Sequence, residues 1–218
     1  MYWTFHRIRL TWQARVLGIS LDLDALESRL LQAIASMDDT VCRVAVYMDG
    51  TVNFSFRGLP SRKSDWAWGV LQRDCVQNAS IKWVDRRDWD VEKDAQKVDL
   101  LLLHSDTGAP LEWCIGNLFV YRPRLGQWLT PPLNAAILPG IMRVIALQFF
   151  KEQGVAVREE PFLLEGDDEL WLSNVVRGFI LVHANKPPHQ TDMSIFATQE
   201  FKCLEAFEQS LEGLFLSN

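Results

Sequence analysis

The stretch that decides the fold runs from Leu111 to Arg143 and reads LEWCIGNLFVYRPRLGQWLTPPLNAAILPGIMR. An acidic residue near its start is followed by the motifs Asn-Leu-Phe, Thr-Pro-Pro and Leu-Pro-Gly-Ile-Met-Arg. These four ordered pieces are Glu112, Asn117–Phe119, Thr130–Pro132 and Leu138–Arg143. The Pro-Gly pair precedes an apolar-periodic run. It therefore predicts a helix that starts near Ile141, where free backbone N–H groups can bind an anion.

The order of the four pieces resembles the cofactor-binding core of fold-type IV pyridoxal-phosphate enzymes, the class IV aminotransferases. This family includes branched-chain and D-amino-acid aminotransferases and 4-amino-4-deoxychorismate lyase. The resemblance implies an α+β fold of the D-amino-acid-aminotransferase type, with pyridoxal 5'-phosphate (PLP) as cofactor. We expect a small N-terminal α/β domain at residues 1–75 and a larger, β-rich α/β domain at residues 76–218 that binds PLP.

The resemblance assigns residues to both ends of the cofactor. Glu112 would face the pyridine nitrogen, because a carboxylate beside a protonated ring nitrogen favours both charged forms. Asn117 belongs to the same core. The amides of Ile141 and Met142 would hold the phosphate at the helix start. A second phosphate contact is Arg9, since His6 to Leu10 matches the family pattern His-x-x-Arg-Leu and a guanidinium suits phosphate oxygens.

The chemical step in this family needs a lysine that forms a Schiff base with the cofactor and then moves protons. The segment Lys82 to Arg86 matches the Lys-x-x-Asp-Arg pattern of the lyase branch, so the resemblance makes Lys82 the catalytic residue. An unperturbed lysine amine is mostly protonated, and neighbouring positive charge would lower its pKa. Arg86 and Arg87 are candidates for that charge, and Arg86 is also a candidate for substrate binding.

A further segment, Asp168 to Val182, resembles the turn that supplies another phosphate contact in relatives. Asn174 matches, but the usual hydroxyl position is Val175, so this contact would either come from a backbone amide or be absent. Arg177 follows in the pattern Asn-x-x-Arg-Gly. It is either the partner of a substrate carboxylate or a surface residue after a strand.

Composition restricts the partners. The chain has 218 residues and a net charge of −6, which argues against nucleic acid as a main partner, because phosphate backbones are bound by clustered Lys and Arg. No apolar run reaches the ~20 residues of a membrane span, and the first residues lack a signal-peptide pattern. We therefore expect a cytoplasmic protein, and the family resemblance implies a small-molecule amino substrate. The four cysteines show no metal or disulfide spacing, so no metal is expected.

Periodicity predicts the elements of both domains. The expected helices cover 5–17, 23–36, 86–96, 141–153 and 198–215. The expected strands cover 41–48, 52–56, 67–73, 98–104, 116–121, 127–129, 155–162 and 170–172. Compared with the family, the strands before the His-x-x-Arg helix are not in this sequence: either the gene is shortened, the start codon lies further upstream, or a partner chain fills the gap. Without these strands a sheet edge would be exposed, which would favour a homodimer.

Three interpretations of the function remain. The preferred one is a lyase that releases pyruvate and 4-aminobenzoate from 4-amino-4-deoxychorismate in folate biosynthesis, because the segments at Lys82 and Asn174 resemble that branch. The second is an aminotransferase acting on branched-chain or D-amino acids. The third is a degenerate relative that keeps the fold without turnover, suggested by the short N-terminus and Val175.

Overall fold

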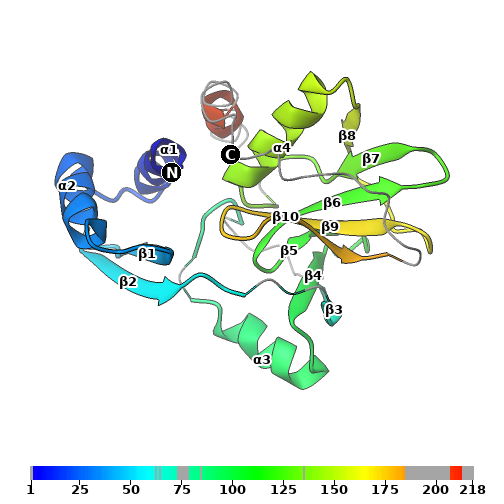
Figure 1. The fold of residues 1–218 in the computed structure, drawn as a ribbon, viewed down its shortest axis with the longest axis horizontal. Coiled ribbons are helices and arrows are strands. Elements are labelled where there is room, and N and C mark those ends of the chain that lie inside the picture. Colours follow the sequence, from blue (N-terminus) through cyan, green and yellow to red (C-terminus); the bar gives the residue numbers. More distant parts are fainter. Residues whose placement is uncertain are drawn as a thin grey trace. The chain divides into compact units, whose positions relative to one another are not determined.

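The computed structural model describes residues 2–61, 63, 65–72, 79–83, 85–134, 136–184 and 207–212. The chain forms two compact units, Met1–Arg62 and Lys63–Asn218 (Figure 1). The division falls after residue 62 rather than after residue 75, because β3 (Trp68–Gln72) pairs with β4 (Leu100–His104) of the second unit. Among the described residues, no helix is both long and apolar enough to cross a membrane.

The first unit consists of two helices and a hairpin: α1 (Trp3–Val16), α2 (Leu23–Ile34), β1 (Thr40–Val46) and β2 (Val52–Gly58). Helix α2 begins where the Asp22 carboxylate accepts a hydrogen bond from Ala25 N at 2.9 Å, which satisfies one of the free N–H groups of the first turn. A tight turn joins the two strands, and in it Gly50 N donates to Tyr47 O at 2.9 Å. Gly50 has a φ of 81° there, a left-handed conformation that glycine adopts without strain.

The second unit is built around one eight-stranded sheet. Its main path has the order β10-β9-β6-β5-β4-β3, with β7 and β8 continuing from β6. The remaining elements are α3 (Arg87–Gln96), β5 (Pro110–Trp113), β6 (Gly116–Arg122), β7 (Gln127–Thr130), α4 (Ile141–Glu152), β8 (Val157–Glu159), β9 (Glu169–Asn174) and β10 (Gly178–His183).

The two ends of this strand path come back together. The rings of Trp68 on β3 and His183 on β10 lie 5.6 Å apart in an edge-to-face arrangement. The guanidinium of Arg177, just before β10, lies 4.9 Å from the centre of the Trp66 ring, just before β3. The sheet is therefore strongly curled, and aromatic side chains bridge its open edges.

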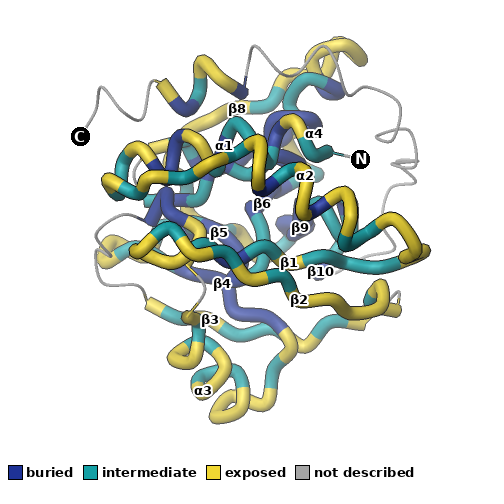
Figure 2. Tube along the Cα trace, turned by 90° about the vertical axis from the view of Figure 1, so that its left-hand side faces the viewer, coloured by how far each residue is buried: buried dark blue, intermediate teal, exposed yellow. Residues whose placement is uncertain are grey.

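The core of the second unit lies on the inner strands. Leu100, Leu101, Leu102 and Leu103 of β4 are all fully buried (Figure 2, dark blue). They pack in one cluster with residues of β5, β6 and β9, including Trp113 and Leu172. A strand that is buried on both faces needs no polar alternation, which explains the continuous leucine run.

Several sequence expectations were incomplete. Strands β5 and β10 were not among the expected elements, and the strand expected over 155–162 covers only Val157–Glu159, because its parallel pairing with β7 extends over three residues. Most of the closing helix expected over 198–215 lies outside the described residues, although residues 207–212 are helical.

His104, at the end of β4, gives the fold a predictable response to acid. Its Nδ1 lies 2.9 Å from Gly108 O and must donate to it, so Nε2, which is buried without a partner, carries the lone pair. Burial lowers the pKa of His104 below its usual 6.5, although the bond to Gly108 opposes the shift. The unfolded state therefore binds more protons just below pH 6.5, and stability is lost as the pH falls through this window.

We expect His104→Asn, whose amide can still donate to Gly108 O, to remove this part of the acid sensitivity. Urea unfolding of wild type and variant at pH 7.5 and at pH 5.5 measures it. The wild type should lose more free energy of unfolding between the two pH values than the variant. Equal losses would show that the His104 ring titrates alike in the folded and unfolded states.

Candidate functional site

The motif pieces read from the sequence form one hydrogen-bonded unit. The Thr130 hydroxyl donates to Leu118 O at 2.7 Å, which joins Thr-Pro-Pro to Asn-Leu-Phe. Arg143 Nη2 donates to Pro131 O at 2.9 Å and to Glu159 Oε2 at 2.7 Å. Arg143 is only 2% exposed, and burial lowers its pKa although Glu159 opposes the shift. The last motif residue therefore ties α4 to the ends of β7 and β8.

Glu112 and Asn117 lie opposite each other on the neighbouring strands β5 and β6. Both are buried, with Glu112 5% and Asn117 3% exposed. Glu112 Oε2 accepts from Leu138 N at 3.2 Å and from Asn117 Nδ2 at 3.4 Å, while the same Nδ2 donates to Leu138 O at 2.9 Å. The carboxylate is thereby fixed next to the segment that leads into α4.

Helix α4 begins after Gly140 without a side-chain cap. The first N–H groups of a helix have no acceptor within the helix, so those of Ile141 and Met142 are available to an anion. Both side chains belong to the core, at 1% and 4% exposed. The structure thus brings together Glu112, Asn117 and the start of α4.

Gly140 is needed because the Asn117 side chain lies directly against it. A Cβ added at Gly140 would lie 1.8 Å from Asn117 Oδ1, far inside van der Waals contact. We expect Gly140→Ala to displace Asn117 from Glu112 and Leu138 O and to destabilise the fold by about 1–3 kcal/mol. Gly166→Ala, where nothing lies within 4 Å of the added carbon, is the matched control. Equal melting temperatures for the two variants would disprove this packing role.

The turn between β9 and β10 is organised by Asn174. Its Oδ1 accepts from Val176 N at 2.8 Å and from Arg177 N at 3.2 Å, and its Nδ2 donates to Ile115 O. The Asn174 side chain is therefore engaged within the protein. Because Asn174 Oδ1 already accepts from the amides of Val176 and Arg177, the amide of Val175 is the candidate at this turn for a phosphate contact.

Lys82 lies in the described segment 79–83, which is neither helix nor strand, and its side chain is exposed. The two arginines that follow it have partners of their own. Arg87 forms an exposed ion pair with Asp85, with Nε 3.0 Å from Oδ1, and this hydrogen bond lowers the pKa of Asp85 to about 2. Arg86 donates from Nη1 to Cys114 O at 2.7 Å. The charge of Arg87 is thus compensated locally, and Arg86 is directed at the backbone.

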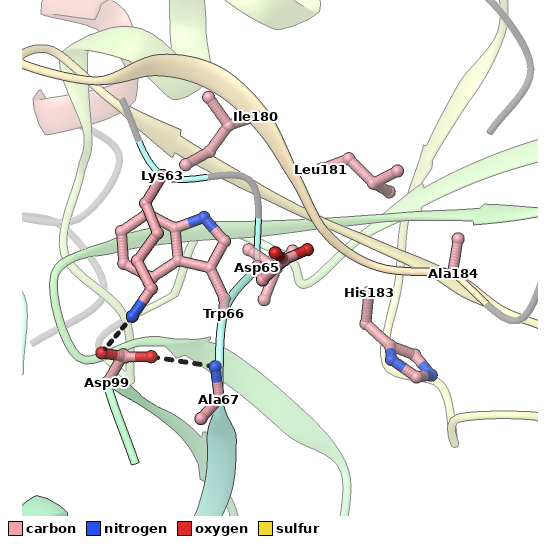
Figure 3. Close-up of a pocket in the computed structure, with 10 residues that line it drawn as sticks. Lys63, Asp65, Trp66, Ala67, Asp99, Ile180, Leu181, His183 and Ala184 are labelled. Carbon is pink, nitrogen blue, oxygen red and sulfur yellow. Dashed lines mark hydrogen bonds and ion pairs between the residues drawn. The ribbon is translucent and has the colours of Figure 1, made fainter. Parts of the chain in front are cut away.

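Arg177 lies beside a groove of about 810 Å³ between the two edges of the sheet path. The groove is lined by residues before β3 and by the end of β10, with Asp99 (Figure 3). Lys63 Nζ forms an ion pair with Asp99 at 2.6 Å and lies 5.6 Å from the centre of the Trp66 ring. Lys82 and Glu112 do not line this groove.

Arg9 belongs to the first unit. It lies on α1 and is 6% exposed, and its Nη2 lies 3.4 Å from His6 Nδ1. His6 therefore acts as the hydrogen-bond acceptor in this pair, since a guanidinium can only donate. The two matched residues of His-x-x-Arg thus lie next to each other.

Comparison with solved structures identifies the class of fold. An aminotransferase of Mycobacterium tuberculosis described as hypothetical superposes with a TM-score of 0.70 at 18% identity, covering 99% of this chain and 84% of that chain. A Legionella pneumophila protein, "Putative 4-amino-4-deoxychorismate lyase", gives 0.67 at 18% identity, covering 86% of this chain and 81% of its own. The fold is that of the fold-type IV aminotransferases, as expected from the sequence.

The sequence comparisons then give the family. The model for amino-transferase class IV matches residues 76–184, half of the chain, and the chain therefore belongs to this family of PLP enzymes. A curated relative from Methanocaldococcus jannaschii, "Putative branched-chain-amino-acid aminotransferase", is 33% identical over 88 residues. That match covers 39% of this chain and 30% of the relative, so the chain spans less than a third of the relative's length.

The residues of the site fit the family's cofactor. PLP is the cofactor of class IV aminotransferases, and the Mycobacterium tuberculosis protein has also been solved in a PLP-bound form, so this sequence expectation is confirmed. The buried Glu112 carboxylate is suited to a protonated ring nitrogen, and the uncapped start of α4 is suited to a phosphate. Sequence reasoning missed the backbone acceptors Cys114 O and Ile115 O, because carbonyl groups leave no signal in a sequence.

Proposed function

We propose that the chain is a PLP-dependent lyase that releases pyruvate and 4-aminobenzoate from 4-amino-4-deoxychorismate, a reaction of folate biosynthesis. The observation that carries this proposal is the buried Glu112 carboxylate, fixed 3.2 Å from Leu138 N before α4. It occurs in one unit with the segments Lys82–Arg86 and Asn174–Gly178, which resemble the lyase branch.

Within this proposal, the residues hold the cofactor at both ends. Glu112 binds the pyridine nitrogen, and Asn117 keeps the carboxylate in place through its 3.4 Å contact. The amides of Ile141, Met142 and Val175 bind the phosphate. The role of Arg9 as a clamping cation stays a prediction from the sequence. When bound, the cofactor supplies an electron-withdrawing ring that stabilises negative charge on the substrate carbon bearing the amino group.

Lys82 is the proposed catalytic residue because its amine can do all the proton transfers. It takes a proton from the ring carbon that carries the amino group. As the bond between the ring and the enolpyruvyl oxygen breaks, it gives a proton to the methylene carbon of the leaving group. The products are then pyruvate and an aromatic ring.

Arg177 is proposed to bind a carboxylate of the substrate. Its guanidinium lies 4.9 Å from the centre of the Trp66 ring, so one face of its plane is occupied by an aromatic surface. A guanidinium stacked in this way still presents N–H donors at its edge, which suits a carboxylate.

An aminotransferase acting on branched-chain or D-amino acids is the second candidate, and the match to the Methanocaldococcus jannaschii relative favours it. In that case Lys82 would take the α-proton of the amino acid instead. A homodimer in the cytoplasm remains our expectation for either enzyme, and a catalytically inactive relative is the third possibility.

The two activities are separated by their products. Purified protein with PLP is incubated with 4-amino-4-deoxychorismate, and 4-aminobenzoate and pyruvate are measured by chromatography. Parallel reactions contain 2-oxoglutarate with leucine or D-alanine, and glutamate is measured. Equimolar 4-aminobenzoate and pyruvate would support the lyase. Glutamate alone would replace it with the transferase, and no product in any reaction would leave the inactive relative.

A further inference from the structure

The tight turn Cys114–Ile115 connects β5 and β6 and lies between Glu112 and Asn117 in the sequence. Its flanking residues Trp113 and Gly116 pair directly across the hairpin. Both backbone carbonyls of the turn accept hydrogen bonds from side chains that come from other segments. The turn that follows Glu112 is therefore a point where distant parts of the second unit meet.

The first of these side chains is Arg86. Its Nη1 donates to Cys114 O at 2.7 Å, its Nε lies 3.4 Å from Trp83 O, and its guanidinium lies 4.7 Å from the centre of the Trp89 ring. The planar guanidinium of Arg86 thus contacts Trp83, which follows Lys82, Trp89 in the first turn of α3, and Cys114 after the end of β5. This explains why an arginine rather than a lysine occupies the position, since only the guanidinium offers several donors and a stacking face.

The second side chain is Asn174, which donates to Ile115 O while its own oxygen shapes the β9–β10 turn. The same hairpin end therefore anchors two segments that carry proposed site residues, Lys82 on one side and Val175 on the other. A charge-assisted bond such as that of Arg86 is stronger than a neutral one, so Arg86 is the principal anchor.

We propose that Arg86 is a positioning residue, which fastens the segment that carries Lys82 to the hairpin that carries Glu112. Segment 79–83 has no helix or strand of its own to fix it. Without the anchor, the amine and the carboxylate would still be present but would be held together less well, which lowers the probability that both engage one cofactor. The positioning role of Arg86 rests on the proposed function of Lys82 and Glu112. The anchor, which is the hydrogen bond from Arg86 to Cys114 O, does not depend on that function.

The anchor can be tested without cofactor, because Cys114 reports on it. Cys114 is 2% exposed, its sulfur accepts from Leu101 N at 3.4 Å, and burial raises the pKa of its thiol, so it should react slowly. In Arg86→Met, labelling of Cys114 by iodoacetamide, followed by peptide mass spectrometry, should be faster by about tenfold or more. The control Arg124→Met removes an exposed arginine that pairs with Asp167 at 2.6 Å, away from the proposed site residues, and it should label like wild type. Equal rates in wild type and Arg86→Met would overturn the anchor.

The positioning role is tested with PLP by titrating the long-wavelength absorption band against pH and by measuring the PLP dissociation constant. Arg86→Met should weaken PLP binding by about tenfold and shift the midpoint of the titration, whereas the control Arg124→Met should do neither. Arg86→Lys keeps the positive charge but loses the planar guanidinium with its several N–H donors. If it behaves like Arg86→Met, position is what matters, and full rescue by Lys would overturn the proposal in favour of a charge effect. If the wild type shows no band, the function proposed for Lys82 fails, and the positioning role fails with it, while the Cys114 labelling still decides whether the anchor exists.

Discussion

Lys82→Ala is expected to abolish the long-wavelength absorption band that wild-type protein shows with added PLP. The band requires a covalent bond between the cofactor's aldehyde and a lysine amine, and alanine offers none. Whichever reaction the wild type catalyses, its turnover should fall by about 10²–10⁴-fold or more, because we propose that the same amine moves the protons. Absorption spectroscopy and product assays on the purified variant measure the two effects.

Lys93→Ala is the matched control for this experiment. Lys93 lies on α3 close in sequence to Lys82, and its ammonium pairs with Asp90 at 2.5 Å. It should keep the band and the activity. A band that survives in Lys82→Ala and disappears in another lysine variant would move the catalytic role to that lysine. A wild type without any band would contradict both enzyme interpretations.

Glu112→Gln is expected to weaken PLP binding by about ten- to a hundredfold, because a neutral amide replaces the charge-assisted bond to the ring nitrogen. Turnover should fall further, since the ring nitrogen would lose the partner that keeps it protonated. The fold should be affected much less. A glutamine oxygen can still accept from Leu138 N and Asn117 Nδ2, so the free energy of unfolding without PLP should change by less than about 1.5 kcal/mol.

The comparison of binding with stability makes the Glu112 experiment specific. Glu160→Gln, a change of the same chemistry at a half-exposed side chain, should alter neither quantity. If Glu112→Gln destabilises the cofactor-free protein strongly and leaves the affinity for PLP unchanged, Glu112 is a structural residue of the hairpin and not a cofactor ligand.

The sequence predicted the motif pieces well because each depends on local chemistry. Helix α4 begins at Ile141 as expected, since Pro-Gly followed by apolar periodicity is a signal contained within a few residues. The same motif predicted that Glu112 and Asn117 belong together, and they lie opposite each other on paired strands. The sequence could not show that Leu138 N binds the carboxylate, since this contact depends on the path of the chain between β7 and α4.

Other features depend on pairing partners that a single segment does not reveal. Strand β10 exists because it pairs with β9, and a six-residue apolar run of this kind can equally be a buried loop or part of a helix. The contacts of Arg86 could not be predicted either. From its place after Lys82, the sequence suggested that Arg86 contacts the substrate. In the structure its guanidinium lies against Cys114 O and the Trp89 ring. The contact with Cys114 joins residues far apart in the sequence, so no local pattern predicts it.

The leucine run of β4 has a consequence for how the second unit finds its native pairing. In most strands, sliding by one residue turns polar side chains inward, and this penalty selects a single alignment. In Leu100–Leu103 every side chain is buried, so a slip by one position would exchange leucine for leucine. Correct alignment must come from the ends of the strand, where Asp99 binds Ala67 N at 2.9 Å and the pairing with β5 shifts between Leu103 and His104. The residues that flank the leucine run, and not the leucines themselves, therefore set the register of β4 in the sheet.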